Sequence, residues 1–203
     1  MIRIRRPLFL TLLLIVASTA PVKARASKLS VSVNMGLNLI SFYTAPIGHS
    51  DNYVGLTVGT LVNYLFRERF GIFLGSDLAH RGTPLIGGET AAFDSLELPF
   101  GGIWNHGNAF FPKNARLVSR LGAFFSHPLS NLKVGNREIQ QANDSAGAYV
   151  GISGHFELGP STALGGIVWG KFGIMKSFKP SPYGESERLI EVGLGASVLF
   201  NLL

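Results

Sequence analysis

The sequence contains no cysteine, although its first residues are typical of an exported protein. An exported chain without cysteine has no disulfide framework, so another feature must stabilise its fold. The absence also excludes a thiolate nucleophile and every metal site that depends on cysteine ligands.

Long apolar runs are also scarce. Residues 8–17 form a short apolar run, preceded by Arg3, Arg5 and Arg6 and followed by Ala-Arg-Ala at 24–26. This order predicts a signal peptide over residues 1–26, cleaved after Ala26, and leaves residues 27–203 as one domain. The run is too short for a comfortable membrane anchor, and no later run of about 18 apolar residues predicts a transmembrane helix.

The predicted mature chain is nearly neutral. The segment expected to be removed carries five of the 18 basic residues and no acid, so 13 basic and 12 acidic residues remain, a net charge of +1. The mature part has no basic run with interleaved aromatics, so nucleic acid is not an expected partner.

The sequence does contain long stretches in which apolar and polar residues alternate strictly. Residues 29–39, LSVSVNMGLNL, alternate over eleven positions, and residues 189–203 alternate in the same way. Eleven residues fit a tilted membrane strand, whereas strands of soluble sandwiches usually have about five or six. The chain is also apolar, with a mean hydropathy of +0.28, and contains 25 glycines. Since lipid admits only helices and closed barrels, the pattern predicts a β-barrel in an outer membrane.

Six further segments between these two have strand-like patterns. They are residues 53–66, 70–80, 93–105, 115–125, 146–158 and 163–178, the last with an expected bulge near its glycines. The total of eight predicts an all-β, eight-stranded, antiparallel up-and-down transmembrane barrel. The connections at 67–69 and 159–162 are short and those at 44–52, 81–92, 126–145 and 179–186 are longer. This asymmetry favours short turns in the periplasm and long loops outside.

Aromatic residues gather near the predicted strand ends, as expected for the girdle of a membrane barrel. They are Tyr43, Tyr53, Tyr64, Phe66, Trp104, Phe110, Phe111, Phe125 and Phe178. Ordinary core aromatics are the alternative interpretation.

Several short stretches resemble the PorT-like outer-membrane β-barrel proteins that are common in Bacteroidota. They are NMGLNLISF in the first strand, YVGLTVG, SDLAHRGT, the LELP of residues 96–99, and the closing GLGASVLF. The resemblance covers roughly residues 29–203. It implies the barrel fold and, from the name-giving branch, a link to protein secretion across the outer membrane. It carries no catalytic residues to this chain.

The polar side chains that alternate inward are the candidate functional residues. They are Glu97, Arg116, Arg120, Ser153, His155, Glu157 and Glu191. Eight strands enclose a space that side chains just fill, and buried charges need partners. We therefore expect a structural network in the lumen, in which Arg116 and Arg120 bridge Glu97, Glu157 or Glu191.

Ser153, His155 and Glu157 also have the residue types of a nucleophile, a base and an orienting acid. A lipid A-modifying enzyme must reach the outer leaflet, however, and this strand leads into the short turn at Gly159. His49 and His127 fall in predicted loops and His80 and His106 near strand ends, with no metal-binding spacing. We expect no catalytic residue, no cofactor and no metal.

These patterns predict a non-enzymatic integral outer-membrane protein, structural or accessory to protein secretion. The alternatives are a lipid A-modifying enzyme and a small periplasmic ligand-binding barrel. Expected partners are outer-membrane lipid and lipopolysaccharide, with secretion-machinery proteins as further candidates.

Overall fold

A computed structural model describes residues 28–44, 48–49, 53–84, 90–107, 115–134, 137–140, 142–175 and 187–202. The predicted signal peptide, 1–26, lies outside these residues, as do Phe110, Phe111 and Phe178 of the predicted girdle. The described part contains no helix long and apolar enough to cross a lipid bilayer.

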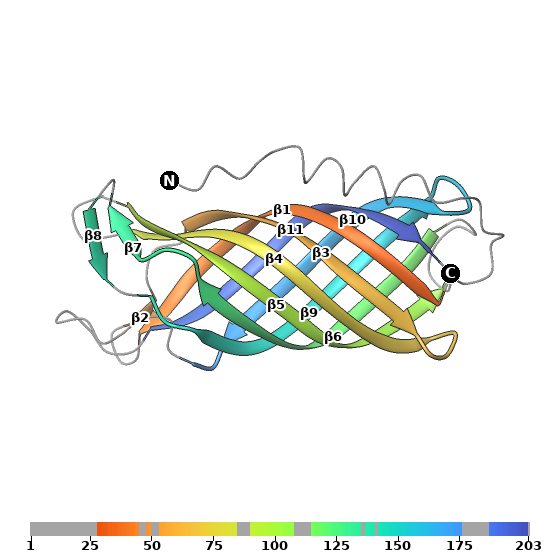
Figure 1. Cartoon of the computed structure of the whole chain (residues 1–203), viewed down its shortest axis with the longest axis horizontal. Coiled ribbons are helices and arrows are strands. Elements are labelled where there is room, and N and C mark those ends of the chain that lie inside the picture. The colour runs from red at the N-terminus through yellow and green to blue at the C-terminus, as the bar shows by residue number, and fades with distance from the viewer. Residues whose placement is uncertain are drawn as a thin grey trace.

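Eight long strands form the body of the described part, and Figure 1 shows them running obliquely around one closed barrel. Their bounds are β1 Leu29–Thr44, β3 Tyr53–Leu65, β4 Phe70–Pro84, β5 Thr90–Gly107, β6 Ala115–Pro128, β9 Ser145–Glu157, β10 Thr162–Gly173 and β11 Glu187–Asn201. Each pairs antiparallel with its neighbours in sequence, and β1 pairs with β11 from Ser30↔Asn201 to Thr44↔Glu187, which closes the barrel. The predicted eight-stranded antiparallel up-and-down fold is confirmed.

Three short strands lie outside this body, in the connections at one end of the barrel. β2, Gly48–His49, pairs with β1, while β7, Leu132–Val134, and β8, Arg137–Gln140, form a hairpin beyond β6. We name this the loop end, with connections at 45–52, 85–89, 129–144 and 174–186. The opposite turn end has connections at 66–69, 108–114 and 158–161. Two of those are tight, with Arg67 N donating to Phe70 O at 3.1 Å and Leu158 N to Thr162 O at 3.0 Å.

Several predicted boundaries were wrong. Residues 81–84 and 90–92, assigned to a loop, belong to β4 and β5, and residues 40–44 extend β1. β10 ends at Gly173 rather than reaching residue 178. The bulge expected in this strand is absent, because β10 pairs with β9 and β11 without a register shift. A register shift lies instead in β5, between Asn105 and Gly107, where Gly107 has a φ of 62°.

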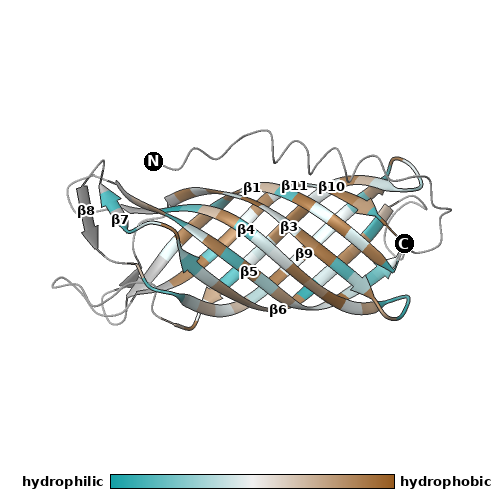
Figure 2. Cartoon of the chain, viewed as in Figure 1, coloured by the Kyte–Doolittle hydropathy of each residue, from teal (hydrophilic) through white to brown (hydrophobic). Residues whose placement is uncertain are grey.

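The two faces of each strand follow the predicted alternation. Outward positions carry exposed apolar side chains, such as Leu121 on β6 at 71% exposure and Leu194 on β11 at 66%. Inward positions carry the buried polar and charged side chains together with a layer of buried apolar ones. Figure 2 shows the apolar residues concentrated around the middle of the barrel and the hydrophilic ones toward its ends. The interior is thus more polar than the outer surface.

Candidate functional site

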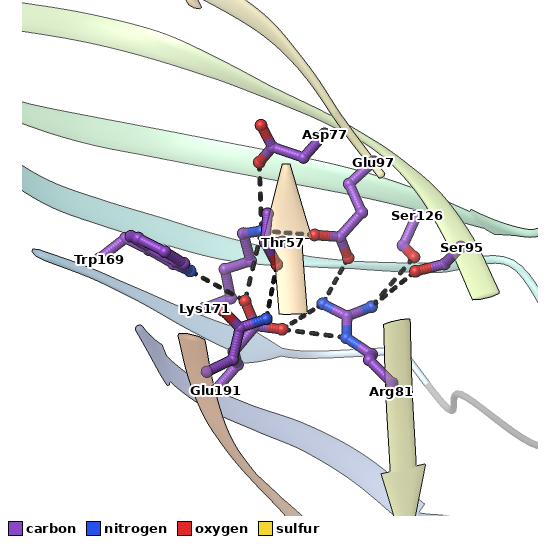
Figure 3. A network of polar contacts seen from close by, with 10 residues as sticks. Thr57, Asp77, Arg81, Ser95, Glu97, Ser126, Trp169, Lys171 and Glu191 are labelled. Atoms are coloured by element: carbon purple, nitrogen blue, oxygen red, sulfur yellow. Dashed lines mark hydrogen bonds and ion pairs between the residues drawn. The ribbon is translucent and has the colours of Figure 1, made fainter. Parts of the chain in front are cut away.

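Five charged side chains meet inside the barrel (Figure 3). Their positions on the strands place them toward the loop end. Asp77 and Arg81 come from β4, Glu97 from β5, Lys171 from β10 and Glu191 from β11. All five are buried, and Arg81, Glu97, Lys171 and Glu191 are almost completely so. We call these five residues the loop-side network.

Arg81 uses its whole guanidinium in this network. Nε donates to Glu191 Oε2 at 2.9 Å, and Nη2 contacts Glu97 Oε1 at 2.5 Å as well as Glu191 Oε2. Nη1 donates to the hydroxyl oxygens of Ser95 at 3.2 Å and Ser126 at 3.4 Å. The flat, multiply donating guanidinium suits such a site because it can bind several acceptors at fixed positions.

Lys171 is the second cation and contacts all three carboxylates. Its Nζ lies 3.3 Å from Asp77 Oδ2 and 3.4 Å from Glu191 Oε1, and it also donates to Glu97 Oε2. Glu97 and Glu191 therefore each contact both cations. An isolated buried charge is strongly disfavoured, so the network is stable only while its cations and carboxylates remain together.

Trp169 connects this network to the apolar part of the interior. Its indole Nε1 donates to Glu191 Oε1 at 2.9 Å, while the ring lies over glycines of β1 and β11. A Cβ on Gly193 would lie 2.1 Å from Trp169 Cε2, and one on Gly36 would lie 2.6 Å from Trp169 Cη2. Glycine is required at both positions because no larger residue leaves room for the indole.

An apolar layer fills the barrel next to Trp169. It consists of Leu61, Leu65, Phe73, Ile103, Val118, Tyr149, Ile167 and Trp169. The rings of Phe73 and Tyr149 are tilted, with centroids 5.5 Å apart. Side chains thus occupy the interior at this depth, as expected for a barrel of eight strands.

A second polar region lies toward the turn end, where it interleaves with Leu65 and Val118 of the apolar layer. We call it the turn-side layer: Asn63, Arg116, Arg120, Ser153, His155 and Ser197. Arg120 Nε donates to Asn63 Oδ1 at 3.2 Å and Nη1 to Ser153 Oγ at 2.8 Å. His155 Nε2 lies 2.9 Å from Ser197 Oγ. Amide and hydroxyl groups are the main partners here, in contrast to the carboxylates of the loop-side network.

Six of the seven predicted inward residues belong to these two regions, and Glu157 lies at the rim. Glu97 and Glu191 belong to the loop-side network, while Arg120, Ser153 and His155 are buried in the turn-side layer. Arg116 Nη2 lies 3.5 Å from Glu157 Oε1 at the rim, where the Glu157 side chain is 43% exposed. The predicted bridge from Arg120 to a carboxylate was wrong: within the described residues, no ion pair joins Arg120 to Glu97, Glu157 or Glu191.

Sequence reasoning missed three of the five network residues: Asp77, Arg81 and Lys171. Residues 70–80 carry apolar residues on both faces, and the sequence pattern predicts a loop that begins at Arg81. Every second residue from Phe73 onward lies on the same face, which includes Asp77, Ala79 and Arg81. The alternation therefore contained the information that Arg81 faces inward. Lys171 stands in a strand with several glycines, which gave no clear facing pattern.

Ser153, His155 and Glu157 do not bond to one another as a nucleophile, base and acid would. Ser153 Oγ accepts from Arg120, His155 contacts Ser197, and Glu157 pairs with Arg116. All three come from β9, toward the turn end.

Three further histidines whose side chains are described lie on the outer face. His80 Nδ1 lies 2.7 Å from Asp94 Oδ1, and His127 Nδ1 lies 2.7 Å from Asp144 Oδ1. His106 Nε2 lies 2.6 Å from Ser119 Oγ, and its ring stacks on that of Trp104 with centroids 5.2 Å apart. In the part of the chain that the structure describes, no group of three or more potential ligands could hold a metal ion.

The closed wall and filled interior define a small antiparallel β-barrel, and solved outer-membrane barrels have the same fold. The outer membrane protein OprG from Pseudomonas aeruginosa superposes with a TM-score of 0.58 at 11% identity, covering 86% of this chain and 95% of that chain. Neisserial surface protein A (NspA) superposes with a TM-score of 0.54 at 14% identity, covering 87% of this chain and 98% of that chain. At these identities the likeness shows the fold alone. No protein-family model matches the sequence, and comparison with curated proteins gives no match.

Proposed function

We propose that this chain is a non-enzymatic integral protein of a bacterial outer membrane, structural or accessory to protein secretion. The observation that carries the membrane assignment is the distribution of apolar side chains. Every one of the eight long strands exposes large apolar residues outward, while the charges of the loop-side network lie inside. A soluble periplasmic barrel would expose polar side chains on that surface, because contiguous apolar patches are small on soluble monomers.

The height of the apolar surface fits a bilayer. On β5 the outward residues from Leu96 to Trp104 are apolar or glycine, and polar Asp94 and His106 follow at the two ends. At about 3.3 Å per residue and a tilt of about 40°, the stretch from Leu96 to Trp104 spans roughly 20 Å along the barrel axis. The stretch from Asp94 to His106 spans roughly 30 Å. These two lengths bracket the apolar band of about 25 Å that is typical of outer-membrane barrels.

Aromatic residues support a membrane boundary at the turn end. Tyr64, Phe66, Phe70 and Trp104 are exposed there, and the Phe70 and Trp104 rings have centroids 5.2 Å apart. Aromatic side chains favour the interface between hydrocarbon and headgroups. In this orientation the short turns lie in the periplasm and the long connections lie outside the cell. The apolar surface then contacts lipid and lipopolysaccharide.

The interior supports a role that involves neither transport through the lumen nor catalysis. The loop-side network and the apolar layer fill the barrel across its width, so we expect no steady conductance in a planar lipid bilayer. The contacts of Ser153, His155 and Glu157 leave them without the arrangement of a catalytic triad. A role in secretion rests on the resemblance to PorT-like proteins and involves protein partners at the loops or turns.

The secreted and surface proteome of the native bacterium tests this role, compared between the wild type, a strain lacking the gene and the complemented strain. If the protein is a secretion accessory, a defined set of exported proteins disappears from outside the deletion strain and returns on complementation. An unchanged proteome would rule out the secretion role and leave a structural barrel.

A further inference from the structure

Arg120 is a buried cation whose protein partners are all neutral. The residue is 3% exposed, and its guanidinium donates to Asn63 Oδ1 and Ser153 Oγ. Within the described residues no carboxylate lies within ion-pair distance of it. Each cation of the loop-side network, by contrast, contacts two or three carboxylates. A buried charge is stable only when an opposite charge or several dipoles compensate it, so Arg120 is the least compensated cation of the interior.

A small cavity lies beside Arg120. Its polar walls are formed by Ser30, Asn63, Asn105, Arg116, Arg120 and His155, and its apolar side by Leu65, Ile103, Val118 and Leu199. The volume is about 10 Å³, which leaves room for one small guest. Among the residues that the structure describes, two arginines and no carboxylate line this space.

Acidic residues are scarce at this end of the barrel. Among the connections at 66–69, 108–114 and 158–161, Glu68 is the single acidic residue in the sequence. Glu157 is half exposed at the rim and pairs with Arg116 rather than Arg120. His155, on the cavity wall, is 1% exposed, and its Nδ1 has no hydrogen-bond partner among the described residues. A guest that accepts hydrogen bonds and carries negative charge fits these surroundings.

We propose that the cavity binds one small monovalent anion of halide size beside the Arg120 guanidinium. The anion supplies the negative charge that the protein does not, and it accepts hydrogen bonds from the Arg120 guanidinium. Phosphate, sulfate and organic carboxylates are excluded by size. Arg116 lines the cavity and also pairs with Glu157 at the rim, so its side chain links the cavity to the solvent-exposed end of the barrel. This inference is independent of the proposed role in secretion.

The test is a halide titration of the purified full barrel in detergent micelles. Sodium chloride is exchanged for sodium gluconate at constant ionic strength, because gluconate is too large for the cavity, and the thermal unfolding midpoint is recorded. Specific binding leaves the midpoint unchanged well below the dissociation constant of chloride, and each tenfold increase in chloride above that constant then raises the midpoint by about 3–6 °C. Arg120→Gln is expected to abolish the dependence. Arg69→Gln, which removes an exposed arginine from the β3–β4 turn at the same end, is the matched control and should retain it.

A second measurement tests whether the cavity binds an anion even if Arg120→Gln fails to fold. Crystals of the unmodified protein grown in sodium bromide should show an anomalous peak in the cavity within about 3.5 Å of the Arg120 guanidinium. Midpoints that are equal in chloride and gluconate, together with a water molecule or no bromide at this position, would overturn the proposal. A midpoint dependence that persists in Arg120→Gln would show that chloride acts elsewhere.

Discussion

The loop-side network and the turn-side layer are two solutions to the same problem, which is how to hold charge inside a narrow barrel. In the loop-side network, Arg81 and Lys171 contact Asp77, Glu97 and Glu191 directly. In the turn-side layer, Arg120 is held by one amide and one hydroxyl. The difference shows that two properties of a charged residue are independent: the face of the strand on which it lies, and the groups that compensate its charge.

Removing one cation from the loop-side network should have the largest effect. Arg81→Met leaves Glu97 and Glu191 with Lys171 as their shared cation, so two buried carboxylates lose a partner. We expect the free energy of unfolding to fall by about 3–5 kcal/mol, the usual result of breaking a buried ion pair. Urea unfolding in phospholipid vesicles measures it, with the exposed Arg69→Met as control. A loss below about 1 kcal/mol would mean that the network does not hold the barrel together.

Filling the space beneath Trp169 should have the next largest effect. Gly193→Val places side-chain atoms where the indole lies and displaces Trp169 from Glu191, with an expected loss of about 1–3 kcal/mol. Trp169 fluorescence in a Trp104→Phe background should change together with the unfolding midpoint. Gly166→Val is the control, because a Cβ there meets no atom closer than 3.6 Å. Equal effects of the two variants would contradict the packing described here.

Neutralising Arg120 should destabilise the barrel less than neutralising Arg81. This pair of variants directly compares the turn-side layer with the loop-side network. Arg120→Met leaves Asn63 and Ser153 without a donor but leaves no carboxylate unpaired, so we expect a loss of about 1–2 kcal/mol. The measurement is the same urea unfolding, in chloride and in gluconate. If Arg120→Met were as destabilising as Arg81→Met, the distinction between the two regions would fail.

The rim pair should contribute least. Glu157→Gln removes the partner of Arg116 at a separation of 3.5 Å, where Glu157 is half exposed. Solvent screens such pairs, so the expected loss is below about 1 kcal/mol and should shrink further in high salt. Thermal unfolding at low and high salt checks it. A salt-independent loss would place Glu157 in a drier environment than the structure gives it.

Alternation along the strands made most of the fold predictable. Residues 29–39 and 189–203 carry apolar side chains at every second position, so their strands and outward faces followed from the period of two. β10 was harder because glycines at 165, 166, 170 and 173 have no side chain to mark a face. The end of β4 was missed because Arg81, Gly82 and Pro84 are residue types common in loops.

The site was less predictable than the fold, for a related reason. The period of two placed Glu97, Arg120, Ser153, His155 and Glu191 inside the barrel but does not say which of them meet. Meeting depends on the depth of each residue along a tilted strand and on the register around the closed barrel. Glu97 therefore contacts Arg81 and Lys171 from β4 and β10, and Arg120 contacts Asn63 of β3.

The central claim, that the apolar outer surface faces lipid, is tested most directly by fractionating the native bacterium and washing its outer membranes with alkaline carbonate. The account predicts that the protein remains in the washed membrane pellet and enters solution only with detergent. Release with the periplasmic contents, or into the carbonate wash, would contradict it and identify the chain as a soluble or peripheral barrel.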